Sequence, residues 1–272
     1  MPTESVSFGI VPSIDAARGR ARLAELCELL GDHAGVRFVP SHHDSYRGLV
    51  DAFDRHQIQV GWLPPIASAQ FVERGRASIL ALPIRRGSVS YRSALIARPN
   101  GPRSLADLRG RRVAWVDPES SSGYLVPRLM LRSAGLDATS LFGEERFLMS
   151  HAAVVEAVAT GRSDVGATYC SDTGGRADVK GAWTAATKTP LEVVAMTGAI
   201  PNDAIVASVA VPTDVRSKLL RWFMDLPSPE AKRLSALLFG ADGFRMVAKE
   251  HFDPLRTILS AAKGSLLPTS NA

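Results

Sequence analysis

Short apolar runs alternate along this chain with longer segments in which apolar residues recur at helical spacing. Apolar runs bounded by turn residues predict strands, and the helical period predicts amphipathic helices. The expected strands span residues 6–11, 36–39, 58–62, 79–83, 90–97, 113–116, 165–169, 191–196 and 205–209. The expected helices span residues 16–30, 46–55, 67–73, 123–134, 151–160, 212–225, 229–239 and 242–249, and the first is expected to end at Gly31. This alternation is typical of an α/β fold with mainly parallel sheets.

The clearest linker-like segment, Pro99-Asn100-Gly101-Pro102, separates two groups of these elements. It predicts a first lobe of residues 1–95 with 201–272 and a second lobe of residues 96–200. Because the chain crosses between the lobes twice, we expect two hinge strands. A small ligand is expected to bind in the cleft between the lobes and to be buried when the hinge closes.

Candidate chemistry is concentrated where the expected strand 113–116 ends at Asp117-Pro118. Three consecutive serines, Ser120, Ser121 and Ser122, then precede Gly123 and a segment with helical periodicity. Serine hydroxyls at a helix start lie beside backbone N–H groups that lack intrahelical partners, at the positive end of the helix dipole. Such a turn suits a tetrahedral oxyanion. The simpler alternative is an ordinary serine N-cap, which needs one serine only.

The segment Asp117–Pro127 resembles a motif of the phosphonate-binding proteins of ABC transporters, Asp-Pro-x-Ser-Thr-Ser-Gly-[Phe/Tyr]-Leu-x-Pro. Ser121 stands where the motif has threonine. Further segments resemble the family in the same order along the chain, namely 42–46, 60–62, 90–93, 150–167 and 200–203. The resemblance implies a two-lobed type II periplasmic-binding-protein fold, with two mainly parallel sheets joined by two hinge strands. It also implies a non-catalytic protein that binds phosphonate, phosphate or a similar small oxyanion for transport.

The resemblance also assigns roles to residues outside the serine run. Ser120, Ser121, Ser122 and Gly123 would hold the oxygens, and two tyrosines would cap them, while a histidine and an acid would contact the rest of the ligand. The remaining candidate residues, implied in this way, are Tyr46, Trp62, Tyr91, His151, Tyr169, Ser171 and Asp203. Simpler alternatives stay open: half-buried aromatic packing for the tyrosines and Trp62, a solvated His151, and a turn-forming Asp203.

Two departures from the family pattern affect the expected ligand. Aminoethylphosphonate binders carry a second acid just after the strand that matches 165–169, whereas Ser171 stands there in this chain and Asp172 follows it. Pro64-Pro65 also replaces a small or aromatic pair at a strand end that is expected to face the cleft. Both changes leave the phosphonate specificity open.

Composition and charge exclude several other classes of function. The net charge is +5, but the arginines are scattered and no nucleic-acid motif is present, so we expect no nucleic-acid partner. No apolar run approaches the roughly 18 residues of a membrane span, so the protein is not expected to be embedded in a membrane. His42, His43 and Asp44 lack a third histidine or cysteine at ligand spacing, and we expect no metal and no cofactor. A monomer is expected.

The compartment and the partner depend on export. The sequence enters its first strand directly after Met1–Glu4, without a basic or apolar leader, which favours the cytosol. A mature exported form would instead work in the periplasm with an ABC permease. The alternative function is a cytosolic biosynthetic enzyme on the same fold that acts on a small anionic substrate. No activated nucleophile, acid–base pair or cofactor motif supports that alternative.

Overall fold

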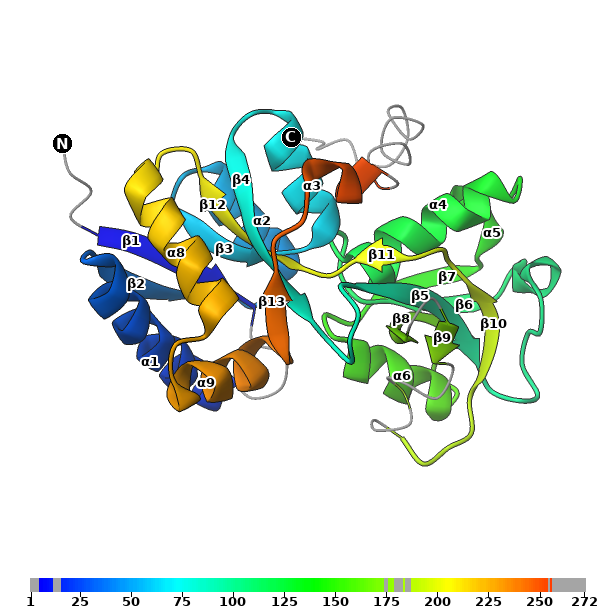
Figure 1. The fold of residues 1–272 in the computed structure, drawn as a ribbon. Helices are drawn as coiled ribbons and strands as arrows, with labels where there is room; N and C mark the ends of the chain where they lie inside the picture. Colours follow the sequence, from blue (N-terminus) through cyan, green and yellow to red (C-terminus); the bar gives the residue numbers. More distant parts are fainter. Residues whose placement is uncertain are drawn as a thin grey trace. The chain divides into compact units, whose positions relative to one another are not determined.

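The computed structural model describes residues 5–11, 16–173, 176–178, 183, 187–253 and 255 (Figure 1). The chain forms two compact units, each with a sheet of its own. The first unit contains Met1–Ser90 and Pro201–His251, and the second contains Tyr91–Ile200 and Phe252–Ala272. The chain therefore leaves the first unit after Ser90 and returns to it at Pro201. The predicted lobe boundaries stay a prediction.

The first unit is built on a six-stranded sheet in the order β13-β4-β12-β3-β1-β2. Its strands are β1 (Ser5–Ile10), β2 (Arg37–His42), β3 (Val60–Leu63), β4 (Ala77–Ile84), β12 (Ala204–Ser208) and β13 (Gly243–Arg245). Strand β1 runs parallel to β2 and β3, whereas β12 is antiparallel to β3 and β4, and β13 is antiparallel to β4. The sheet is therefore mixed rather than mainly parallel.

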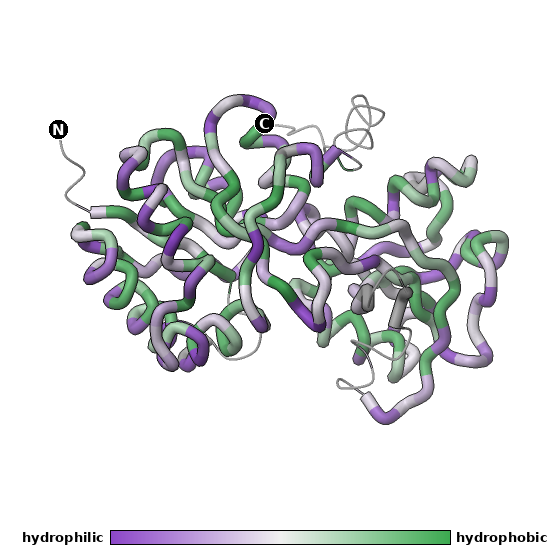
Figure 2. The backbone as a smooth tube through the Cα atoms, in the orientation of Figure 1, coloured by the Kyte–Doolittle hydropathy of each residue, from purple (hydrophilic) through white to green (hydrophobic). Residues whose placement is uncertain are grey.

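Two groups of helices pack on this first sheet. Helices α1 (Ala16–Ala34), α8 (Thr213–Asp225) and α9 (Pro229–Phe239) pack in one hydrophobic core. This core contains Phe8 of β1 and Trp222 and Phe223 of α8. Helices α2 (Tyr46–Asp54) and α3 (Pro65–Glu73) meet through Phe53 and Phe71, whose ring centroids lie 4.8 Å apart. In Figure 2, hydrophobic residues predominate in the strands, whereas hydrophobic and hydrophilic residues alternate along the helices.

Two sequence predictions in the first unit are wrong in detail. Helix α1 does not end at Gly31 but continues to Ala34, and Gly35 beyond it has a φ of 73°. The positive φ at Gly35 is the usual conformation after a helix end. The segment 242–249 is not a helix, because Gly243–Arg245 forms β13, and the 3-10 helix η3 (Lys249–Phe252) follows only later. The antiparallel pairing of β13 with β4 overrides the local helical pattern.

The second unit is built on a seven-stranded sheet whose main order is β10-β5-β8-β6-β7. Its strands are β5 (Ser90–Ala97), β6 (Arg112–Trp115), β7 (Glu144–Phe147), β8 (Val165–Thr173), β9 (Arg176–Asp178), β10 (Glu192–Met196) and β11 (Ile200–Pro201). Strand β6 is parallel to β7 and β8, whereas β5 is antiparallel to β8 and β10. This sheet is also mixed, within the expected α/β class.

The helices of the second unit cover both faces of its sheet. They are η1 (Leu105–Leu108), the π-helical turn η2 (Ser121–Leu125), α4 (Val126–Ser133), α5 (Ala138–Leu141) and α6 (His151–Ala159). Leu131 of α4 packs with Trp115 in one core, and Val155 of α6 packs with Ile96 and Cys170 in another. At Gly166 an added Cβ would lie 2.7 Å from Val154, so α6 packs closely over β8.

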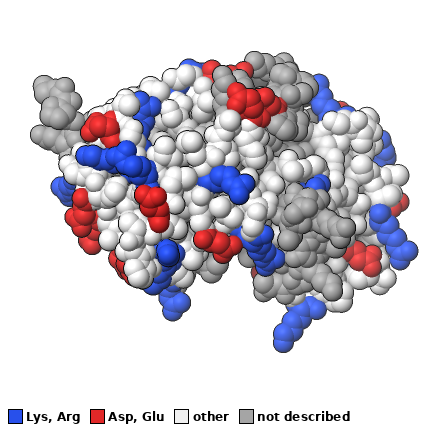
Figure 3. All heavy atoms as spheres, in the orientation of Figure 1, with Lys and Arg blue, Asp and Glu red and all other residues white. Residues whose placement is uncertain are grey.

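None of the helices in the described part of the chain is long and apolar enough to cross a membrane. On the face shown in Figure 3, basic and acidic side chains are interspersed. A nucleic-acid interface would require basic side chains clustered on one face.

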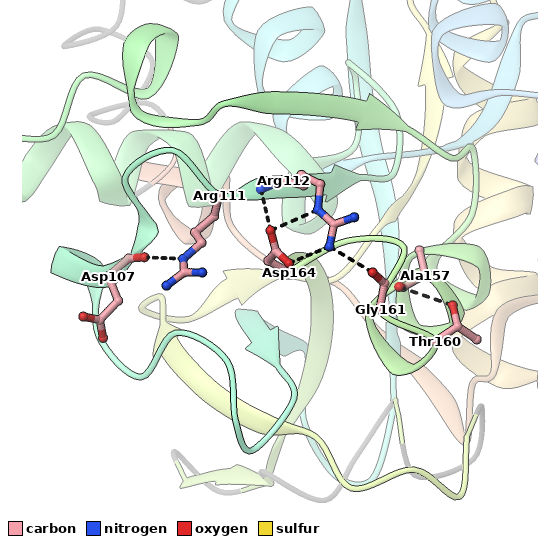
Figure 4. A network of polar contacts seen from close by, with 7 residues as sticks. All are labelled: Asp107, Arg111, Arg112, Ala157, Thr160, Gly161 and Asp164. Atoms are coloured by element: carbon pink, nitrogen blue, oxygen red, sulfur yellow. Dashed lines mark hydrogen bonds and ion pairs between the residues drawn. The ribbon is translucent and has the colours of Figure 1, made fainter.

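An ion pair joins the starts of β6 and β8 in the second unit (Figure 4). The Asp164 carboxylate accepts hydrogen bonds from Arg112 Nη2 at 2.7 Å, from its Nε at 3.1 Å and from its backbone N–H at 3.0 Å. Arg112 Nη2 also donates to the Gly161 carbonyl at 3.0 Å. These bonds, with the side-chain bonds to Arg112 as the largest cause, hold the pKa of Asp164 below its ordinary value.

We predict that Asp164→Asn destabilises the protein, because it removes the charge and one acceptor while keeping the volume. Its melting temperature should fall by roughly 2–6 °C at pH 7. Because the pKa of Asp164 is lower in the folded state, the folded state binds fewer protons than the unfolded state around that pKa. The ion pair therefore stabilises the protein fully above the ordinary pKa of Asp. This stabilisation is lost as the pH falls through the pKa of the folded state. Thermal unfolding at pH 7 and near pH 3 measures both effects. Glu156→Gln, at the exposed Glu156–Arg162 pair, is the control, and an equal effect there would contradict the prediction.

Candidate functional site

The serine run forms a buried turn between β6 and α4. Ser120 is the N-cap of the π-helical turn, and its Oγ accepts a hydrogen bond from Gly123 N–H at 3.1 Å. The Leu125 N–H donates to the Ser120 carbonyl at 3.0 Å, which closes the wider turn. Ser120, Ser121 and Ser122 are each only 3% exposed. Buried hydroxyls at a helix start are placed to donate hydrogen bonds to an anion at the positive end of the helix dipole.

Hydrogen bonds from the strands hold this turn in place. The Ser93 hydroxyl of β5 donates to the Ser122 carbonyl at 2.6 Å, and the Val116 N–H donates to the Gly123 carbonyl at 3.1 Å. Asp117, which is 1% exposed, accepts a bond from the Glu119 N–H at 2.8 Å through Oδ1. The turn is therefore fixed before any ligand arrives, which lowers the entropic cost of binding. Nothing in the serine pattern itself identified Ser93 as its support.

Gly123 is required by the packing of the turn. A Cβ added there would lie 2.4 Å from Val116 Cγ2 and 2.7 Å from Ser120 Oγ. Both distances are shorter than any ordinary carbon contact, and Val116, directly after β6, is buried. The motif needs glycine here because the turn packs directly on a β-branched side chain.

Three predicted residues of the second unit, Tyr91, Tyr169 and Ser171, lie on one face of its sheet. In antiparallel strands, directly opposite residues share a face, and so do residues two apart along one strand. Tyr91 pairs with Ser171, and Ser93 pairs with Tyr169. Because Ser93 contacts the serine turn, Tyr91, Tyr169 and Ser171 belong to the face on which that turn lies. Tyr169 is 42% exposed there.

His151 lies at the same edge of the sheet, where β6, β7 and β8 have their carboxyl ends. Ser150 caps α6 by accepting from the Ala153 N–H at 3.2 Å, so His151 is the first residue of the helix. Its Nδ1 lies 3.1 Å from Thr168 Oγ1, and its ring meets Tyr169 edge-on at 4.9 Å between centroids. Desolvation lowers the pKa of His151 to about 4, so its imidazole is neutral at pH 7.

The predicted residues of the first unit lie at the carboxyl edge of its parallel strands. Tyr46 begins α2 shortly after β2, Trp62 lies in β3, and Asp203 precedes β12 opposite the end of β3. Trp62 packs edge-on against Phe239 at 5.2 Å between ring centroids. Burial raises the pKa of Asp203, and the nearby Arg85 guanidinium opposes that rise. Sequence reasoning missed Arg85 because it is remote from Asp203 along the chain.

Groups suited to metal or nucleophilic chemistry are not assembled in the described part of the chain. There, no three of His, Cys, Asp and Glu side chains lie close enough together to hold a metal ion. His43 instead contacts Ser41, with 3.1 Å between its Nε2 and the serine Oγ. Cys170 is fully buried, and its Sγ lies 3.9 Å from Met196 Sδ. The side chain of Asp172 lies outside the described residues.

Solved structures similar to this chain identify its fold as that of type II periplasmic binding proteins. A binding protein component of an ABC phosphonate transporter from Pseudomonas aeruginosa is 21% identical, with a TM-score of 0.77 over 97% of this chain and 90% of that one. PhnD1 from Prochlorococcus marinus, solved with methylphosphonate, is 17% identical, with a TM-score of 0.78 over 96% and 98%. XAC2383 from Xanthomonas citri, solved with chloride or with ATP, is 21% identical in the chloride form, with a TM-score of 0.78 over 96% and 99%.

The family follows from the sequence match. The model of the family described as ABC transporter, phosphonate, periplasmic substrate-binding protein matches residues 8–252. The chain belongs to this family of phosphonate-binding proteins. The resemblance stated from the serine motif is thereby confirmed, and the family favours a binding protein over the enzyme alternative.

We predict that Gly123→Ala disrupts the serine turn. The new methyl group overlaps Val116 and Ser120, so the free energy of unfolding should fall by about 1–3 kcal/mol. Chemical denaturation measures this change. Gly198→Ala in the same unit is the matched control, because no atom lies within 4 Å of its added Cβ and its φ is not positive. Equal stabilities of the two variants would show that the close packing of the turn is not required.

A second prediction concerns the charge of His151. Its side-chain NMR signals should not titrate between pH 8 and about pH 5, because the folded pKa is about 4. The folded pKa lies below that of the unfolded chain, so this histidine removes stability as the pH falls from about 6.5 toward 4. His151→Asn assigns the signals and should weaken the acid-induced loss of stability. A titration midpoint near 6.5 for the wild-type signals would contradict the desolvated geometry.

Proposed function

We propose that this protein is a non-catalytic binding protein that captures a phosphonate, phosphate or similar small oxyanion through its serine turn. One observation carries the proposal: three consecutive serines are buried at a helix start, and their turn is held by hydrogen bonds from Ser93 of β5 and from Val116 just after β6. Membership in a family of phosphonate-binding proteins supports the same ligand class.

Each candidate residue has a role that suits its geometry. Ser120, Ser121 and Ser122, with the N–H groups around Gly123, hold the anionic oxygens. Tyr91, Tyr169 and Ser171 share the face of the turn and offer hydroxyl donors. His151 is neutral and so can donate one hydrogen bond without adding charge. Each bond to the charged ligand contributes about 1.5–3 kcal/mol, so a few of them support micromolar binding.

The first unit supplies the remaining contacts of the proposal. Tyr46 is the first residue of helix α2, whose N-cap is Ser45, with Gly48 N–H donating to the Ser45 hydroxyl at 3.0 Å. Asp203 faces the organic substituent of the ligand. Trp62 serves mainly to pack, since its ring contacts Phe239 and Arg85.

The partner we propose is an ABC permease, to which a monomeric binding protein delivers its ligand. The family description names periplasmic substrate-binding proteins, which supports the periplasm over the cytosol as the compartment of this chain.

Thermal stabilisation by a panel of anions tests the proposal. The panel holds phosphate, phosphite, methylphosphonate, sulfate and an alkylsulfonate. An anion present at a hundred times its dissociation constant should stabilise the protein by about 2.7 kcal/mol. We expect this for a phosphorus anion, and Ser121→Ala should weaken its binding by about 10- to 100-fold.

Ser235→Ala is the matched control for that experiment. Ser235 is also fully buried, but it lies in the first unit, and its hydroxyl has no hydrogen-bond partner among the described residues. Its removal should leave anion binding unchanged. Stabilisation by no phosphorus anion, or equal binding by the Ser121→Ala variant, would overturn the proposed function.

A further inference from the structure

Asp203 of the first unit already has a positive partner within that unit. Its Oδ2 lies 3.7 Å from Arg85 Nη1, and the two side chains are only 19% and 31% exposed. The ion pair is partly withdrawn from water, so its mutual attraction is screened less than that of a surface pair. Asp203 and Arg85 together carry no net charge.

The guanidinium of Arg85 is held on two further sides. Its Nε donates to the Phe239 carbonyl at 2.9 Å, and its Cζ lies 5.5 Å from the centre of the Trp62 ring. Three contacts from three different elements fix a side chain that is otherwise long and flexible. Arg85 therefore lies beside Asp203 as part of the fold.

The backbone around the pair is braced by one buried side chain. Asn202, which is fully buried, donates from Nδ2 to the carbonyls of Pro83 at 2.8 Å and Ser88 at 3.2 Å. Its backbone N–H donates to the Val89 carbonyl at 2.8 Å. Asn202, the residue before Asp203, is thus hydrogen-bonded to both sides of the hairpin that carries Arg85.

This arrangement determines which ligand substituent Asp203 can accept. A bare buried carboxylate would attract an ammonium group, whereas a cationic substituent placed here would also meet the guanidinium of Arg85. The repulsion between like charges a few ångströms apart in a partly buried site offsets the attraction to the carboxylate. A substituent without positive charge meets no such penalty.

Four residues of the second unit that belong to the proposed site carry no carboxylate. Tyr91, Tyr169 and Ser171, which share the face of the serine turn, are neutral, whereas the acidic Asp117 is buried beside the turn and accepts the Glu119 N–H. At the same edge, His151 meets Tyr169 through its ring. None of these four offers a carboxylate to an ammonium group.

We propose that Arg85 is a specificity-determining positioning residue, and that its pairing with Asp203 restricts the ligand to phosphonates whose organic substituent carries no positive charge. This inference rests on the proposed function, since it concerns the substituent that Asp203 would face.

Two ligands of matched size test the inference by calorimetric titration. They are n-propylphosphonate and 2-aminoethylphosphonate, and the terminal methyl group of the first is replaced by an ammonium group in the second. The wild-type protein should bind n-propylphosphonate at least about tenfold more tightly. Arg85→Gln, which removes the opposing charge, should lower the ratio of the affinity for n-propylphosphonate to that for 2-aminoethylphosphonate by about tenfold. Arg85→Lys, which keeps the charge, should largely keep this ratio.

Arg76→Gln is the matched control variant. Arg76 also lies in the first unit and forms an ion pair with Asp54. Its Cζ lies 5.9 Å from the centre of the Phe71 ring, and its side chain is 32% exposed. This variant should leave the ratio of the two affinities unchanged.

The outcomes separate the two proposals. Tighter or equal binding of 2-aminoethylphosphonate by the wild-type protein would overturn the inference and leave the proposed function standing. An unchanged ratio in a folded Arg85→Gln variant would also overturn it. Binding of neither ion, and of no other phosphorus anion, would overturn the proposed function and the inference with it. If Arg85→Gln fails to fold, the wild-type ratio alone decides the inference.

Discussion

The second unit depends on one constraint: a polar turn must be buried directly on the apolar end of β6. Buried backbone N–H and carbonyl groups need partners, because leaving one unpaired costs as much as a lost hydrogen bond. The turn meets this need with Ser120 Oγ for the Gly123 N–H and the Ser93 hydroxyl for the Ser122 carbonyl. Only glycine at position 123 allows the turn to approach Val116 closely enough. The same small residues that satisfy the packing leave hydroxyl groups at a helix start.

The charges of the two units are arranged differently. At the carboxyl edge of the second sheet, the side chains around the serine turn are hydroxyls, aromatic rings and a neutral imidazole, with the acidic Asp117 buried beside them. An anion bound there, as we propose, would be held by oriented dipoles and hydrogen bonds, which are strong where water is excluded. The first unit instead carries full charges at its edge, and the Asp203–Arg85 pair compensates them internally.

Local patterns in the sequence predicted most of the elements, whereas contacts between distant residues could not be read from it. The break at Asp117-Pro118 followed by three serines correctly indicated a strand, a turn and a helix start. The mixed sheets were missed because an antiparallel partner such as β12 is set by long-range pairing with β3 and β4. The helix expected at 242–249 was wrong for the same reason, since β4 pairs with Gly243–Arg245. The neutrality of His151 depends on burial against Thr168 and Tyr169, which no spacing reveals.

This division between local and distant contacts has a consequence for specificity. The serine turn is a continuous segment, so its sequence alone carries the hydroxyl groups that we propose to hold an oxyanion, and it lies within the residues that the family model matches. The environment of Asp203 is assembled from β3, the hairpin after β4, the end of α9 and the residues before β12. A single substitution at any of these places changes the charge or shape beside the carboxylate without altering the turn. Under the proposed function, chains that share the serine motif are therefore free to differ in the ligand substituent that they accept.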